Sequence, residues 1–270
     1  MLKLLLIAIG IYLAVLLLFA ALQAKILFPV GAVPAAGLLP PGAQRLTVTA
    51  LDGARLEGVH IPPLLAAPQR TLAVVFGGNG WNAQHAAELV RRIWPQVDVA
   101  AFHYRGYPPS GGNPSAAALL ADAPLTLAAA RNAVQPVRTV AVGMSVGSGV
   151  AASLAGSGQV DGAILVTPFD SLSAVARGHY PWLPVKLLFR HEIDAAAALR
   201  RSPVPMALIA AERDRVIPAE RTAALRRSVP NLVSDRTVPG AGHNDLYERP
   251  HFHQAMNEAL AALLAAAPQR

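Results

Sequence analysis

Cysteine is absent from this chain, and charged residues make up only 14% of it. Without cysteine there is no disulfide bond, no thiolate nucleophile and no zinc site built on thiolates, and the redox compartment is left open. Acidic residues are also few. The chain has 16 Asp and Glu against 23 Lys and Arg, which gives a formal net charge of +7.

A basic stripe of the kind that binds nucleic acid is absent too. The basic residues are spread along the chain, with pairs only at Arg91-Arg92, Arg200-Arg201 and Arg226-Arg227. This distribution favours an anionic lipid surface over nucleic acid as the partner of the positive charge. Repeats and low-complexity tracts are also lacking, so the 270 residues predict one large α/β domain with an appendage.

The appendage is a long apolar run near the N-terminus. Residues 4–22 carry no charge, and a helix of that length spans a bilayer. A cleavable signal peptide has a shorter apolar region, and the best cleavage site here, Leu22-Gln23-Ala24, has leucine where a small residue is needed. We therefore expect residues 1–24 to be an uncleaved transmembrane anchor. The alternatives are a signal peptide with a weak site and a helix buried on the domain.

The charges that flank this run predict its orientation. Lys3 precedes the run and Lys25 follows it, with no further basic residue before Arg45. Counted with the α-amino group, the slight excess of positive charge lies on the N-terminal side. The expected arrangement is a single-pass membrane protein with the catalytic domain outside the cytoplasm.

The segment after the anchor changes in composition and then in pattern. Residues 25–44 are rich in Pro, Gly and Ala without periodicity, which predicts a connector. A folded domain is expected over residues 45–270. It opens with two alternating runs, 46–51 and 55–61, on either side of Asp52-Gly53, and this pattern is typical of an antiparallel β-hairpin.

Short apolar runs then alternate with helical stretches. The runs are 72–76, 97–102, 139–143, 163–166, 206–210 and, less clearly, 232–238; the helices are expected at 83–93, 116–133, 146–154, 219–228 and 251–266. Strands buried on both faces and separated by helices predict a mostly parallel sheet of the α/β class. Residues 169–202 interrupt the alternation and predict a small lid.

The strongest chemical signal is the segment Gly143-Met144-Ser145-Val146-Gly147. It follows an apolar run and precedes a helix rich in small residues, and this context is typical of a nucleophile elbow. The glycines permit the tight turn that lifts a serine hydroxyl above the strand ends. A glycine-rich turn in which Ser145 merely caps the helix is the alternative.

A serine nucleophile needs a histidine base and an acid that orients it. His243 lies in a glycine-containing loop between the last expected strand and the last helix, whereas the other seven histidines lie elsewhere in the pattern. Asp214 follows the run 206–210 and is our choice for the acid. Asp170, which follows the preceding run, and Asp245 are the competitors.

An oxyanion hole should combine the amide after the nucleophile with an amide in the loop after the first parallel strand. These are the backbone amides of Val146 and Asn79. The loop Phe76-Gly77-Gly78-Asn79-Gly80 lets the backbone approach a developing alkoxide, although Asn79 is also a common turn residue. The dinucleotide and P-loop patterns are absent from this loop, so we expect no cofactor and no metal.

With these segments in view, the chain resembles the α/β-hydrolase superfamily, and within it the membrane-anchored, serine-aminopeptidase-like branch. The loop 76–80, the stretches 104–107 and 110–115, and the segments around Asp214 and His243 carry the resemblance, which extends from Phe28 to His243. Gly77 and Ala211 depart from it, standing where the family usually has histidine and often has glycine. The resemblance implies a carboxylesterase, an acyl-thioesterase or a lipid hydrolase.

The expected function is therefore cleavage of an ester or thioester of a hydrophobic or lipid-like small molecule, through an acyl-enzyme on Ser145. A peptide substrate is less favoured, because no run of acidic residues suggests a pocket for an amino terminus. The alternatives are a serine peptidase of the same fold and a catalytically silent membrane-tethered binding protein. Nothing in the pattern indicates an oligomeric state.

Overall fold

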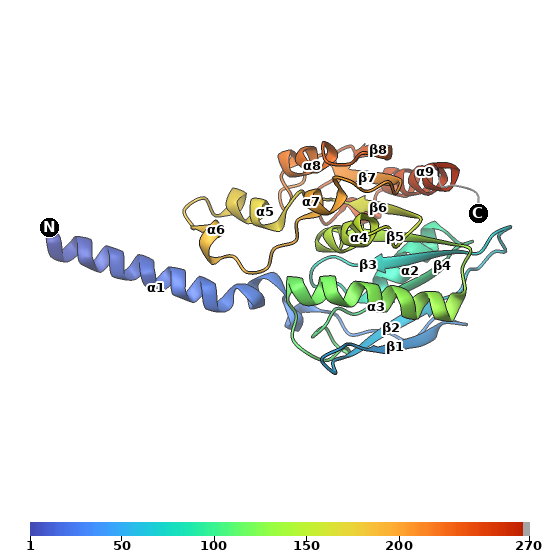
Figure 1. Cartoon of the computed structure of the whole chain (residues 1–270), viewed down its shortest axis with the longest axis horizontal. Helices are drawn as coiled ribbons and strands as arrows, with labels where there is room; N and C mark the ends of the chain where they lie inside the picture. The colour runs from blue at the N-terminus through green and yellow to red at the C-terminus, as the bar shows by residue number, and fades with distance from the viewer. Residues whose placement is uncertain (267–270) are drawn as a thin grey trace.

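The computed structural model describes residues 1–266, and within them the named strands form one eight-stranded sheet. The strand order is β1-β2-β4-β3-β5-β6-β7-β8. A long apolar helix, α1 (Leu2–Leu27), projects from one end of the domain (Figure 1). The order of the strands puts β5, which precedes Ser145, near the middle of the sheet.

The sheet opens with the predicted antiparallel pair, which the structure confirms. Strand β1 (Gln44–Thr49) pairs with β2 (Arg55–Ile61), and β2 pairs antiparallel with β4 as well. The connection turns at Gly53, whose φ is +86°. Glycine adopts this backbone conformation without the strain that a Cβ would introduce.

The other strands are parallel, as the apolar runs predict. They are β3 (Thr71–Phe76), β4 (Asp98–Phe102), β5 (Arg138–Met144), β6 (Gly162–Val166), β7 (Met206–Ala211) and β8 (Leu232–Val238). Strands β3 to β7 are almost entirely buried because helices cover both faces. Their carboxyl ends share one edge of the sheet, where the loops that carry the candidate site residues begin.

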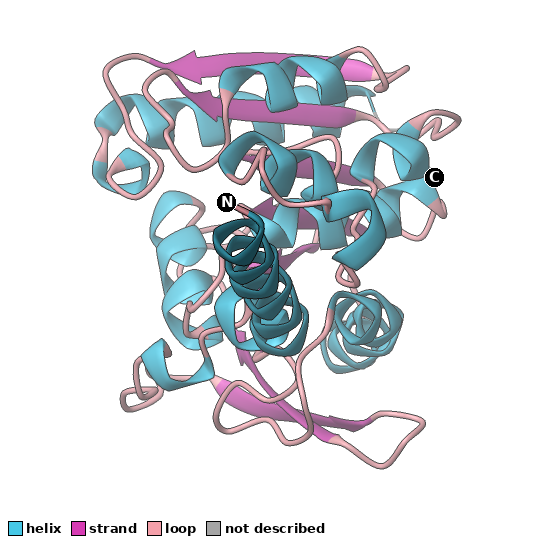
Figure 2. Cartoon of the chain, turned by 90° about the vertical axis from the view of Figure 1, so that its left-hand side faces the viewer, coloured by secondary structure: helices cyan, strands magenta, loops and turns pink. Residues whose placement is uncertain are grey.

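Alternate residues of the strands pack into two separate cores. Leu72 and Val74 of β3 face a core with α3 (Ala116–Val134), α4 (Val146–Gly156) and α8 (Ala219–Arg226), whereas Ala73 and Val75 face a core with α2 (Ala83–Ile93) and α9 (Pro250–Ala266). Figure 2 shows helices on both sides of the strands. This is the three-layer arrangement expected of a wound parallel sheet.

The insertion between β6 and β7 divides into two parts. Its last helix, α7 (Ala195–Leu199), buries Ala195 and Leu199 in the core beside α4. Helices α5 (Leu172–His179) and α6 (Val185–Leu188) stand further out, on the side of α1 (Figure 1). The lid stays a prediction for this segment, and only its outer part stands out from the body of the domain.

The segment that follows α1 is packed onto the domain. The helix itself continues to Leu27, and the next residue, Phe28, is buried in the core. Asn82 Nδ2 donates to the Pro34 carbonyl at 2.9 Å, and Gln84 Nε2 donates to the Leu38 carbonyl at 2.9 Å. A short 3-10 turn, η1 (Val30–Ala32), lies within it, and η2 (Leu246–Glu248) precedes α9. The connector therefore packs on the domain and fixes the base of α1 instead of tethering it loosely.

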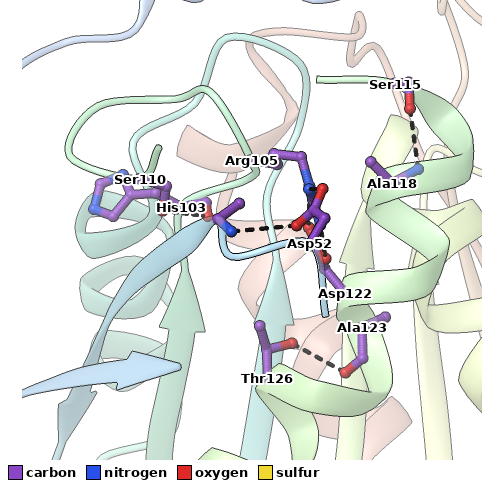
Figure 3. Close-up of polar contacts among 10 residues, drawn as sticks. Asp52, His103, Arg105, Ser110, Ser115, Ala118, Asp122, Ala123 and Thr126 are labelled. Atoms are coloured by element: carbon purple, nitrogen blue, oxygen red, sulfur yellow. Dashed lines mark hydrogen bonds and ion pairs between the residues drawn. The ribbon is translucent and has the colours of Figure 1, made fainter. Parts of the chain in front are cut away.

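Arg105 joins the antiparallel hairpin to helix α3 (Figure 3). Its guanidinium donates to both carboxylate oxygens of Asp122 on α3, at 2.6 and 3.0 Å, and also pairs with Asp52 in the β1–β2 turn. The side chains of Arg105 and Asp122 are both more than 90% buried, whereas that of Asp52 is 62% exposed. The role of this arginine is thus architectural.

Replacing Arg105 should destabilise the domain strongly. An Arg105→Met substitution leaves the Asp122 carboxylate buried without its partner, and loss of one member of a buried pair costs about 3–5 kcal/mol. Asp52→Asn is the matched control, since an exposed pair contributes only about 0–1 kcal/mol. Denaturant titration of the detergent-solubilised chain measures both. Equal stability of the two variants would contradict the assigned role.

Candidate active site

The turn between β5 and α4 holds Ser145 in a strained conformation. Its φ is +53°, which a residue with a side chain adopts rarely and at an energetic cost. The turn closes because Gly143 and Gly147 lack side chains. A Cβ on Gly143 would lie 2.3 Å from the Gly147 carbonyl oxygen, and a Cβ on Gly147 would lie 2.1 Å from that of Phe76. The spacing of the two glycines thus has a steric origin.

Three side chains from different loops meet at this turn. Ser145 Oγ lies 3.0 Å from His243 Nε2, and His243 Nδ1 lies 2.7 Å from Asp214 Oδ2. Both distances are those of hydrogen bonds. The side chains of His243 and Asp214 are 10% and 6% exposed. The structure therefore brings together the serine, the histidine and the first-choice acid of the sequence analysis.

The Asp214 carboxylate has a fixed orientation. Its other oxygen, Oδ1, accepts hydrogen bonds from the amides of Val216 and Ile217, both at 2.8 Å. A bond from the Arg213 amide to the Ala241 carbonyl, at 2.8 Å, ties the acid loop to the histidine loop. With Oδ1 engaged by the backbone, Oδ2 is directed to the imidazole.

The competing acids have other partners. Asp170 Oδ2 accepts from Arg221 at 3.1 Å. Asp245 Oδ1 accepts from the Gly242 amide at 2.6 Å, and its Oδ2 pairs with Arg249. None of these bonds joins either carboxylate to the imidazole of His243, so the geometry favours Asp214 over both.

Other histidines take structural positions. His60 Nε2 pairs with buried Asp98 at 2.7 Å, and His253 Nε2 bonds to the Tyr247 carbonyl at 3.3 Å. Burial lowers the pKa of His103 to about 4, so that side chain is neutral at physiological pH. Among residues 1–266, no group of three or more His, Asp or Glu side chains is placed to hold a metal ion.

The loop after β3 lies against the elbow. Asn79 lines the same cavity as Ser145, and Val146 is the first residue of α4, where backbone amides lack helical partners. Asn79 Oδ1 accepts a hydrogen bond from buried Tyr107 at 2.6 Å, and Tyr104 donates to the Gly77 carbonyl at 2.7 Å. The two tyrosines thus hold this loop in place through hydrogen bonds. Sequence reasoning missed this contribution, although both stand in a stretch that carries the family resemblance.

The cavity at Ser145 has a volume of about 160 Å³. Its lining residues are Gly78, Asn79, Trp81, Ser145, Val216, His243, Asn244 and Tyr247. Trp81 and Tyr247 form one wall, with ring centroids 4.6 Å apart. Burial raises the pKa of Tyr247, so its phenol is a neutral hydroxyl. A larger cavity, about 480 Å³, includes Gln69 and Val137 at the opposite, amino-terminal ends of the strands and is remote from this chemistry.

The order of the strands and this strand–elbow–helix arrangement are those of the α/β-hydrolase fold. The chain is 31% identical over 223 residues to the uncharacterized protein Rv2307c of Mycobacterium tuberculosis (strain ATCC 25618 / H37Rv), covering 82% of this chain and 79% of that one. It therefore belongs to the same family as Rv2307c. The uncharacterized protein YfhR of Escherichia coli (strain K12) is 28% identical over 228 residues, covering 78% and 77% of the two chains. No family model matches the chain.

Solved structures agree on the fold. An alpha-beta hydrolase from Vibrio vulnificus superposes with a TM-score of 0.71 at 20% identity, covering 89% of this chain and 92% of the other. The Pyrococcus furiosus esterase Pf2001 gives a TM-score of 0.68 at 17% identity, covering 86% and 97%. Since many functions share one fold, these likenesses establish architecture, and the function must be argued from the site.

Proposed function

We propose that this protein is a serine hydrolase that cleaves an ester or thioester bond through an acyl-enzyme on Ser145. The observation that carries the proposal is the continuous row of hydrogen bonds from Ser145 through His243 to Asp214. A serine hydroxyl is a weak nucleophile, and this row supplies both the base and the acid that orients it. The strained elbow holds the hydroxyl at the start of a helix, in a cavity with room for an acyl carbonyl.

The reaction follows from these positions. Ser145 Oγ forms a bond to the acyl carbon while its proton moves to His243 Nε2, and the carbonyl oxygen becomes an oxyanion. When that intermediate collapses, the bond to the leaving group breaks and His243 returns the proton to the departing oxygen or sulfur. Water, deprotonated by the same imidazole, then attacks the acyl-enzyme and releases the acid with free Ser145.

The oxyanion is assigned to the backbone amides of Val146 and Asn79. The close packing of Gly147 on the end of β3 keeps the two amide-bearing segments adjacent. Preorganised amides of this kind need no rearrangement as charge develops, and each contributes about 3 kcal/mol to lowering the barrier. Tyr107, through Asn79, would keep the second segment in place.

The walls of the cavity favour an apolar substrate. Trp81 and Val216 present hydrocarbon surface beside Ser145, so a hydrophobic acyl or alcohol group gains by leaving water there. Fluorophosphonate labelling, followed by a screen of acyl esters and thioesters of graded chain length, tests the proposal. Turnover of peptides alone would favour a serine peptidase. A chain that neither labels nor turns over any of these compounds would be a binding protein on the hydrolase fold.

The proposal includes attachment to a membrane through α1. Helix α1 has 26 residues, its most apolar window has a mean hydropathy of 2.9, and that window is not buried in the domain. Lys3 and Lys25 lie about 33 Å apart at 1.5 Å per residue, close to the hydrocarbon thickness of about 30 Å. We keep the expected orientation, with the catalytic domain outside the cytoplasm, as part of this proposal.

Washing membranes with 1 M salt should leave the full-length protein in the pellet, and detergent should release it. The Debye length falls to about 3 Å at 1 M salt, so attachment through the basic surface alone would be lost. Insertion of an uncharged apolar helix is not screened by salt. Immunoblotting of pellet and supernatant measures the outcome. Release of the full-length protein by salt would contradict the anchor. So would a shortened form in the supernatant that has lost α1 by cleavage.

A further inference from the structure

The outer part of the lid runs alongside α1. We call residues 180–189, from the end of α5 through α6, the lid tip. Tyr12 of α1 donates to the Trp182 carbonyl at 2.9 Å, and the Phe19 and Tyr180 rings lie 6.2 Å apart. Near the base of the helix, Gln23 Nε2 donates to the Leu188 carbonyl at 3.1 Å. Figure 1 shows α6 beside α1.

These contacts set the height of the lid tip relative to the membrane. From Tyr12 to Gln23 the helix rises by about 16 Å at 1.5 Å per residue. Tyr12 lies near the middle of the apolar run 4–22, so an α1 that crosses the bilayer carries the lid tip to the depth of the hydrocarbon. If α1 crosses the bilayer, these contacts are incompatible with a position of the lid tip in the aqueous phase.

The composition of the lid tip suits that environment. Its sequence is Tyr-Pro-Trp-Leu-Pro-Val-Lys-Leu-Leu-Phe, with a single charge at Lys186. Trp182 and Leu187 are 52% and 83% exposed in the isolated protein. Tyrosine and tryptophan are enriched at membrane–water interfaces, and a lysine can extend its ammonium group to the headgroups. Lipid would cover apolar surface that water covers only at a free-energy cost.

Most backbone amides of the lid tip also have acceptors within the chain, those of Trp182 and Lys186 being the exceptions. The amides of Tyr180, Leu183, Val185, Leu187, Leu188 and Phe189 donate to carbonyls within residues 176–185, and Pro181 and Pro184 have no amide hydrogen. The Arg190 amide, just beyond, donates to Gln23 Oε1 at 2.8 Å. Non-helical backbone is tolerated at membrane depth only where its polar groups have partners. Six of the eight amide hydrogens of the lid tip thus need no water, which lowers the cost of burying this short helix in lipid.

A hydrogen bond connects the lid tip to the candidate active site. His179, immediately before the tip, donates through Nε2 to the Val216 carbonyl at 2.8 Å. Val216 lines the cavity at Ser145, and its amide donates to Asp214. The segment at the bilayer therefore adjoins the mouth of the cavity.

We propose that the lid tip is embedded in the bilayer beside α1 and that the substrate is an acyl ester or thioester carried by that bilayer. The substrate class rests on the proposed serine hydrolase function, whereas the position of the lid tip rests on α1 alone. An amphipathic ester already in the membrane would meet the lid tip first and then the cavity, which His179 adjoins through Val216.

Quenching of tryptophan fluorescence by brominated phosphatidylcholine tests the position of the lid tip. The full-length protein is reconstituted into vesicles with and without bromine on the acyl chains. Trp182 should be quenched, and a Trp182→Phe variant should lose most of the quenched signal, since Trp94 is fully buried and Trp81 lies in the active-site cavity. Equal quenching of the wild type and this variant would overturn the proposal.

A second reporter removes any dependence on one residue. In the Trp182→Phe background, Leu187→Trp should restore quenching. Leu64→Trp is the matched control, because Leu64 is also apolar and 62% exposed but bonds to Pro95 at the opposite end of the sheet, and it should not be quenched. If the tryptophans at positions 187 and 64 are quenched to the same extent, the lid tip is not in lipid.

Activity tests the substrate class separately. Wild-type protein should hydrolyse a long-chain acyl ester presented in vesicles, with the Ser145→Ala variant as background. Turnover of a short water-soluble ester without turnover of the vesicle-borne ester would overturn the substrate class and leave the serine hydrolase proposal standing. Failure with every ester would instead overturn the proposed function, while the quenching result still decides the position of the lid tip.

Discussion

Replacing Ser145 with alanine should lower ester turnover by about 10⁴-fold or more and abolish labelling by fluorophosphonates. The substitution removes the atom that forms the acyl-enzyme, so His243 and Asp214 have nothing left to activate. It removes only a hydroxyl from a residue that is partly exposed at the cavity, and alanine tolerates the backbone conformation no worse than serine. Folding should therefore be preserved.

Ser157→Ala is the matched control for this experiment. Ser157 ends the same helix that Ser145 begins, and its hydroxyl bonds only to carbonyls and a side chain within residues 153–159. Its loss should leave labelling and turnover at wild-type values. Labelling that persists in the Ser145→Ala variant would assign the nucleophile to another serine and remove the basis of the proposed function.

The elbow could be predicted because the glycines around Ser145 and the patterns that flank them are visible in the local sequence. Gly143 stands where a side chain would collide with the backbone of Gly147, four residues on, and the apolar run before it identifies the strand. The parallel strands were predictable for a similar reason, since burial on both faces demands uninterrupted apolar residues. Local sequence therefore reveals the constraints that come from neighbours in the chain, at Gly143 and in the strands, but not the contact of Gly147 with Phe76.

Features that depend on distant partners were less accessible. The bracing of Asn79 by Tyr107, 28 residues along the chain, leaves no trace in either segment alone. The docking of residues 28–38 on α2 likewise depends on Asn82 and Gln84, which local sequence presents only as helix-start residues. The contact between α1 and the lid tip joins residues 170 positions apart. Sequence patterns locate elements, but partners at such separations emerge only from packing.

The choice between the two acids shows this limit within the site. Asp214 and Asp170 each follow a parallel strand, so both reach the edge of the sheet where His243 lies. Local sequence does not reveal that Arg221, on α8, pairs with Asp170. Asp214 instead receives two backbone amides on one oxygen and leaves the other for the imidazole. We therefore expect substitution by asparagine to have different effects at the two positions.

Asp214→Asn should lower turnover by about 10⁴-fold, whereas Asp170→Asn should change it by less than about tenfold. The asparagine side chain at position 214 has one oxygen and one NH₂ group in place of two oxygens. If that oxygen accepts from the amides of Val216 and Ile217, as Oδ1 does now, the new NH₂ group faces His243 Nδ1. The imidazole must then accept at Nδ1 and carry its proton on Nε2, the nitrogen that has to receive the proton of Ser145. An amide also fails to stabilise the imidazolium. Steady-state kinetics on one ester, with thermal unfolding to verify folding, compares the variants, and a greater loss with Asp170→Asn would transfer the acid role to that residue.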